Sequence, residues 1–186
     1  MNKTKLVNCF LSGRRKSISK YENQTEELQS KVLQKLIHQA IHTEWGQTHG
    51  FAQVNDYNSF TKTSPISTYE ELKGYIDRMR RGEKDVLWSG KVRWYAKSSG
   101  TTNDKSKFIP VSKECLQDTH YRGGTDAVAL YLGQNPRSRM FDGKALILGG
   151  SHSPNYNLPH SLVGDLSAIL IENVSPFVNH FRIPSK

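Results

Sequence analysis

The sequence contains few cysteines and no long apolar stretch. Its two cysteines, Cys9 and Cys115, are far apart in the chain. Such a pair provides neither a disulfide framework nor a cysteine-based zinc site, and it suits a reducing cytoplasm. The apolar stretch Leu6–Leu11 is too short and too polar for the core of a signal peptide, and no run reaches the ~18 apolar residues of a membrane span. We therefore expect a cytoplasmic protein with no membrane partner.

Acidic residues are absent from the N-terminal residues 1–20. This segment holds six of the 26 basic residues and thus two thirds of the formal net charge of +9: Lys3, Lys5, Arg14, Arg15, Lys16 and Lys20. A basic arm can bind nucleic acid or an anionic membrane. Because no folded nucleic-acid motif follows, we favour a solvated terminus. The alternative function is a non-catalytic basic module that binds nucleic acid or a protein partner. We accordingly divide the chain into a basic segment, 1–22, and a folded part, 23–186.

Apolar residues make up only 35% of the chain, but from Gln24 to Thr43 they recur at helical spacing. This pattern predicts a helix, with Asn23 and Glu26 as its capping pair and Gly46 as its stop. His38 and His42 lie one turn apart on it. Since no third ligand accompanies them, we do not expect a metal site there.

Further elements follow from local signals. The capping box Thr68–Glu71 opens a second helix, which ends at Gly82. Ser112 opens a third, over Lys113–Leu132, although Gly123–Gly124 weakens it. The segment 162–171 fits either a helix or a strand. Short apolar runs predict strands at Val86–Trp88, Val92–Ala96, Phe108–Val111 and Ala145–Leu148. Helices that alternate with strands indicate an α/β fold of mixed helices and short strands.

The most informative stretch is a polar loop between two apolar segments, Trp94–Ala96 and Phe108–Pro110. Small hydroxyl residues surround a glycine over 98–102, and two lysines, Lys105 and Lys107, follow. Glycine lets a polyphosphate approach the backbone, consecutive N–H groups form an anion nest, and hydroxyls add donors. The loop is not a Walker loop, because the second glycine and the following helix are missing. From the residues alone, an ordinary polar turn explains it equally well.

The loop resembles the phosphate-binding motif of adenylate-forming enzymes. Ser98-Ser99-Gly100-Thr101-Thr102, with Lys107 and then Pro110, is similar to the motif of the auxin-responsive (Gretchen Hagen) acyl acid–amido synthetase family. The sequence departs from that family at Asp104, where a glycine is usual. The likeness covers nearly the whole chain but only the N-terminal part of the family's length. Shorter pieces occur in the family's order: Thr43–Gly46, Pro65–Ile66, Tyr69–Glu70, Gly82–Glu83, Gly143–Leu146 and Gly149–Ser151.

The resemblance implies an activity and a site. Members of the family use ATP and Mg²⁺ to activate a carboxylic acid as an acyl-adenylate, which an amine, usually an amino acid, then attacks. The chain would be the N-terminal part of the large domain, incomplete at its C-terminus and inactive alone. No catalytic residue is implied in the loop. Tyr121, His152 and Tyr156 are candidates for the border of an acyl pocket, although packing explains each better. The implied phosphate-binding residues are Ser98, Ser99, Gly100, Thr101, Thr102 and Lys107, with Lys105 as a substitute for Lys107.

Overall fold

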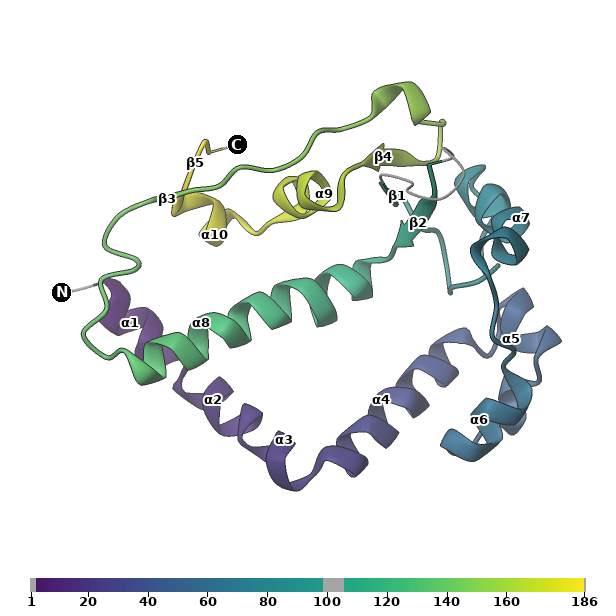
Figure 1. Ribbon diagram of the computed structural model, residues 1–186, viewed down its shortest axis with the longest axis horizontal. Helices are drawn as coiled ribbons and strands as arrows, with labels where there is room; N and C mark the ends of the chain where they lie inside the picture. The colour runs from purple at the N-terminus through teal and green to yellow at the C-terminus, as the bar shows by residue number, and fades with distance from the viewer. Residues whose placement is uncertain (1–2, 99–105, 186) are drawn as a thin grey trace.

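The protein is described by a computed structural model that covers residues 3–98 and 106–185. Helices dominate the fold, and a small sheet lies beside α7 and α9 (Figure 1). The helices are α1 (Lys3–Phe10), α2 (Ser12–Ile18), α3 (Lys20–Asn23), α4 (Thr25–Ala40), α5 (Glu44–Thr48), α6 (Tyr57–Thr63), α7 (Tyr69–Arg80), α8 (Arg122–Gln134), α9 (Leu166–Asn173) and α10 (Pro176–His180). Short turns lie at η1 (Phe51–Gln53) and η3 (Pro154–Tyr156), and a π-helical segment, η2 (Cys115–Tyr121), leads into α8.

The sheet is built around β1 (Trp94–Lys97). This strand pairs antiparallel with β2 (Phe108–Val111) and parallel with β4 (Leu162–Gly164). Two residues of β3 (Ala145–Leu146) pair separately, in parallel, with β5 (Arg182–Ile183). The predicted fold class, mixed helices and short strands, is therefore confirmed.

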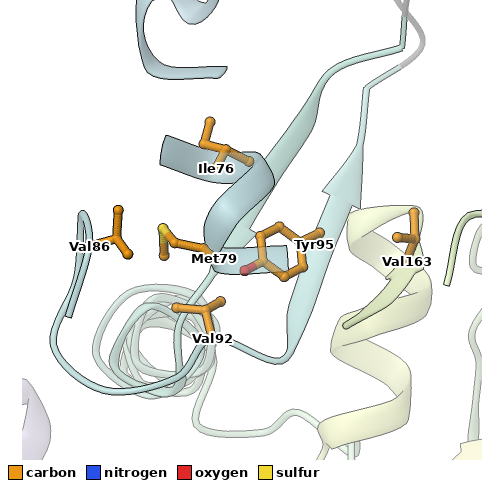
Figure 2. Close-up of a cluster of buried hydrophobic side chains, with 6 residues drawn as sticks. All are labelled: Ile76, Met79, Val86, Val92, Tyr95 and Val163. Atoms are coloured by element: carbon orange, nitrogen blue, oxygen red, sulfur yellow. The ribbon is translucent and has the colours of Figure 1, made fainter. Parts of the chain in front are cut away.

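Both faces of β1 are covered by apolar side chains. Successive residues of a strand point to opposite faces, so Tyr95 and Ala96 join different clusters. The cluster beside α7 is Ile76, Met79, Val86, Val92, Tyr95 and Val163 (Figure 2). The cluster beside η2 and α9 is Ala96, Val111, Leu116 and Ile169. Burial on both sides holds β1 in place, and with it the hairpin that β1 forms with β2.

The first predicted helix is confirmed as α4, but its predicted ends are wrong. Gln24 occupies the N-cap position and makes no side-chain capping bond. At the other end, Thr43 Oγ1 donates to Ala40 O at 2.7 Å and accepts from Gly46 N at 3.0 Å. Thr43 is thus the N-cap of α5, and Gly46 lies inside that helix. The helix α4 therefore ends because a second helix, α5, begins shortly after it, and not because of a glycine.

The second predicted helix is confirmed as α7. Thr68 and Glu71 form the reciprocal capping box, and Gly82 follows the helix with φ = +97°. The predicted strand Val86–Trp88 is wrong. The carbonyl groups of Val86 and of the preceding Asp85 accept hydrogen bonds from α5 instead: Glu44 N donates to Asp85 O at 2.8 Å and Trp45 N donates to Val86 O at 3.0 Å.

The later predictions are largely confirmed. The helix expected over Lys113–Leu132 is present as η2 and α8, with Gly123–Gly124 in the first turn of α8. The segment 162–171 contains both of the expected alternatives, first β4 and then α9. The strand expected at Ala145–Leu148 is limited to the two residues of β3, which are exposed.

The N-terminal helices pack on α8 instead of extending into solvent. Leu11 is only 7% exposed and lies against Ala129 and Leu132. Arg14 donates to both carboxylate oxygens of Asp126, at 2.5 and 2.7 Å. The interpretation of this segment as a solvated terminus is therefore wrong, and part of its positive charge is neutralised within the fold. The division of the chain after residue 22 stays a prediction.

Candidate phosphate-binding site

The polar loop is carried by the hairpin of β1 and β2, as its apolar flanks predict. The last strand pair joins Lys97 to Phe108. Beyond it, Ser98 N donates to Lys107 O at 2.9 Å, and Lys107 N donates to Ser98 Oγ at 3.4 Å. These two bonds close the base of the loop at the two outer residues of the proposed phosphate motif.

Two of the predicted phosphate-binding residues, Ser98 and Lys107, belong to the described part of the chain. Both are half-buried at the base of the hairpin. The other predicted residues, Ser99, Gly100, Thr101 and Thr102, lie outside the described residues, as do Asp104 and Lys105. The structure therefore brings the first and last members of the motif together and leaves the assignment of the whole set as a prediction.

Tyr69 supports the Lys107 side of this base. Its hydroxyl accepts a hydrogen bond from Phe108 N at 2.9 Å, and the ammonium of Lys107 lies 5.5 Å from the centre of its ring. Tyr69 is the first residue of α7, whose capping box fixes where the helix begins. The start of α7 thus sets the position at which β2 leaves the loop.

The other side of the base contains cations that the sequence prediction missed. The ammonium of Lys97 lies 4.4 Å from the centre of the Tyr156 ring. Arg80, at the end of α7, places its guanidinium 3.8 Å from the centre of the Phe108 ring and donates to Tyr156 O at 2.7 Å. The position of Lys97 directly before the motif was a signal that sequence reasoning could have used. The contact with Arg80 joins segments far apart in the chain and had no such signal.

The three candidates for an acyl pocket lie in different surroundings. Tyr121 donates to Leu170 O at 2.8 Å, and burial raises the pKa of its hydroxyl. His152 packs against Trp94, with 5.6 Å between ring centres. Tyr156 alone adjoins the base of the hairpin, through Lys97 and Arg80. Packing thus accounts for Tyr121, whereas His152 is exposed, and its Nε2 also lies 4.0 Å from a carboxylate oxygen of Glu172.

A separate groove of about 670 Å³ lies between α4 and η2, and neither Ser98 nor Lys107 lines it. Its floor is apolar and includes Met79 and Val92, and an ion pair between Lys35 and Asp118, 2.6 Å long, joins its two walls. Cys115 also lines this groove, where burial raises the pKa of the thiol and so disfavours a thiolate.

Metal-binding side chains do not cluster in the part of the chain that the structure describes. No group of three or more His, Cys, Asp or Glu residues there could hold a metal ion. We therefore assign none of these residues to Mg²⁺. Within residues 3–98 and 106–185, every helix is also too short or too polar to cross a membrane.

Comparison with known proteins links most of the chain to one family. A model of the GH3 family N-terminal domain matches residues 14–181. Jasmonoyl--L-amino acid synthetase JAR6 of Nicotiana attenuata is 32% identical over 108 residues, which are 56% of this chain and 19% of that protein. Indole-3-acetic acid-amido synthetase GH3.15 of Arabidopsis thaliana is 32% identical over 93 residues, or 50% of this chain and 16% of that protein.

The fold is similar to that of a solved structure. GH3.15 acyl acid amido synthetase superposes with a TM-score of 0.69 at 22% identity, over 94% of this chain and 30% of that one. The chain thus spans less than a fifth of the curated relatives it matches, and under a third of this structure.

Proposed function

Because the chain belongs to the GH3 family, we propose that it supplies the ATP phosphate-binding hairpin of an enzyme that activates a carboxylic acid as an acyl-adenylate. The acyl group would then pass to an amine such as an amino acid. The observation that carries this proposal is the closure of the β1–β2 loop between Ser98 and Lys107. Its two ends are the first and the last of the phosphate-binding residues that the resemblance implies.

Each residue of the motif has a role in the proposal. Hydroxyl and backbone donors of Ser98, Ser99, Thr101 and Thr102 would bind the phosphate oxygens, and Gly100 would let the chain approach them closely. Lys107 would neutralise charge that develops on the departing pyrophosphate. This work consists of positioning and charge stabilisation, so the loop needs no nucleophile or general base. Magnesium, when bound, would neutralise further phosphate charge.

The names of the relatives suggest the class of substrates. They are described as synthetases that join jasmonic acid or indole-3-acetic acid to an amine. We extend to this chain only the class, a small carboxylic acid and an amine or amino acid. A cytoplasmic location is part of the same proposal, since Cys9 and Cys115 are both free thiols.

The proposal is tested with Lys107→Ala in a polypeptide that also carries the rest of the family's length. Acid-dependent exchange of pyrophosphate into ATP should slow at least about tenfold at subsaturating ATP, because a charged hydrogen bond is worth ~1.5–3 kcal/mol. Lys91→Ala, an exposed lysine ahead of β1, is the matched control and should exchange like the parent. Equal exchange in both variants would remove Lys107 from the phosphate site.

A further inference from the structure

We propose that the groove between α4 and η2 is a binding site for a small organic amine with an apolar body. The ammonium binds Glu114, and the apolar body lies on Trp88 and the floor of the groove. Neither Ser98 nor Lys107 lines this groove, so the inference does not rest on the proposed function.

The groove has the size and the floor of a small-molecule site. Its volume of about 670 Å³ lies within the ~300–1,000 Å³ that is usual for ligand pockets. Met79, Leu87 and Val92 provide apolar surface beside the half-buried indole of Trp88. Met79 and Val92 also belong to the buried cluster beside α7 (Figure 2). Because these two side chains are part of a packed core, the floor is formed before a ligand arrives.

Glu114 is the polar anchor of the groove. It directly precedes η2, where Ser112 Oγ accepts a hydrogen bond from Cys115 N at 3.1 Å and holds the start of the helix. Trp88 Nε1 donates to Glu114 Oε2 at 3.1 Å, so the carboxylate lies at the edge of the indole. Burial raises the pKa of the Glu114 carboxyl, but hydrogen bonds, including those from Trp88 and Ser112, outweigh burial and hold the pKa below its usual value. The group is therefore a carboxylate at neutral pH.

Among the charged side chains that line the groove, Glu114 stands apart. The other three form one cluster, in which Asp118 pairs with Lys35 at 2.6 Å and with Arg122 at 3.1 Å. Glu114 forms no salt bridge within residues 3–98 and 106–185, and its hydrogen-bond donors are neutral. A carboxylate has room for about four hydrogen bonds, so Glu114 can still accept from an ammonium. An organic cation thus complements this side of the groove.

An anionic ligand fits the groove less well. The side chains of Lys35 and Arg122 are 59% and 53% exposed, and both already bind Asp118. Water and salt screen charges in such positions. Trp88 favours the same ligand class as Glu114, because the face of an indole attracts an ammonium. A carboxylate beside an indole, above an apolar floor, therefore selects an amine over an acid of the same shape.

The experiment is a titration of the 186-residue chain with phenethylamine, followed by NMR on the indole N–H signals. The chain has three tryptophans, and Trp88→Phe identifies the signal of Trp88. Phenethylamine should shift this signal until it saturates. Hydrocinnamate has the same phenyl body with a carboxylate in place of the ammonium, and it should bind at least about tenfold more weakly.

Three variants test the role of the Glu114 charge. Glu114→Gln keeps the shape and an acceptor for Trp88, and it should weaken phenethylamine binding about tenfold. Glu114→Asp keeps the charge and should bind more tightly than Glu114→Gln. Glu70→Gln removes an exposed acidic charge outside the groove and should bind like the parent.

The comparison of the two ligands uses the parent chain, so it decides the proposal even if a substitution at Glu114 disturbs folding. Equal affinity for phenethylamine and hydrocinnamate, or equal affinity of Glu114→Gln and the parent, would overturn the assignment of Glu114. A Trp88 signal that does not move would overturn the site itself, including the case in which a second copy of the chain covers the groove. None of these results bears on the phosphate hairpin, which pyrophosphate exchange in Lys107→Ala tests separately.

Discussion

The packing of the N-terminal helices on α8 predicts a large difference between two neighbouring residues. Leu11 is 7% exposed and contacts Ala129 and Leu132, whereas Phe10 is 86% exposed. Truncating a buried leucine to alanine costs about 2–5 kcal/mol. Since part of the surroundings of Leu11 is only half-buried, we expect a loss of about 2–3 kcal/mol for Leu11→Ala, or a thermal midpoint about 5–10 °C lower.

The assay is thermal and urea unfolding followed by far-UV circular dichroism. Phe10→Ala removes a larger apolar side chain from the adjacent position and should change the free energy of unfolding by less than about 0.5 kcal/mol. If both variants are as stable as the parent, the segment does not pack on α8 in solution. If Phe10→Ala is the more destabilising change, the helices dock through the opposite face.

Three further predictions concern pH, backbone geometry and the isolated chain. Burial raises the pKa of Tyr95 to about 12, so the neutral phenol stabilises the fold below pH ~10 and this contribution is lost as the pH rises toward 12. When urea unfolding is measured across that pH range, the free energy of unfolding should fall less in Tyr95→Phe than in the parent. Gly82→Ala should cost about 1–2 kcal/mol more than Gly90→Ala, because both have positive φ but only at Gly82 would the added Cβ lie 2.7 Å from the His160 ring. Calorimetry with Mg-ATP should show that the 186-residue chain binds no more tightly than about millimolar, because contacts with an open loop compete with water and salt. The same chain should release no pyrophosphate when the acid is added. Micromolar binding together with turnover would contradict this prediction.

Local sequence signals predicted several elements well. The capping box at Thr68–Glu71 lies within one turn and needs no distant partner, and α7 begins where it predicts. The polar loop was found because its apolar flanks form the paired strands β1 and β2. In both cases the interactions that fix the element join residues close in the chain.

The failures at α4 and Val86–Trp88 have a common cause. Gly46 was expected to end α4, and Val86 was expected in a strand, but Gly46 lies inside α5 and Val86 O accepts a hydrogen bond from Trp45 N of that helix. There Thr43 caps the helix, and backbone oxygens from a segment forty residues away accept its first N–H groups. The spacing of apolar residues gives no information about hydrogen bonds between backbone groups so far apart in the chain.

The sequence by itself indicated the fold class and the hairpin that carries the motif, because periodicity and capping are properties of neighbouring residues, and the family entered through the resemblance of that motif. Tertiary structure alone decided what surrounds that hairpin. It placed Arg80 against Phe108 and Tyr156, and Lys97 over the Tyr156 ring. It also turned a basic terminus into helices docked on α8. These contacts join segments separated by many residues, so their free energy depends on how the chain packs and leaves no periodic pattern in the sequence.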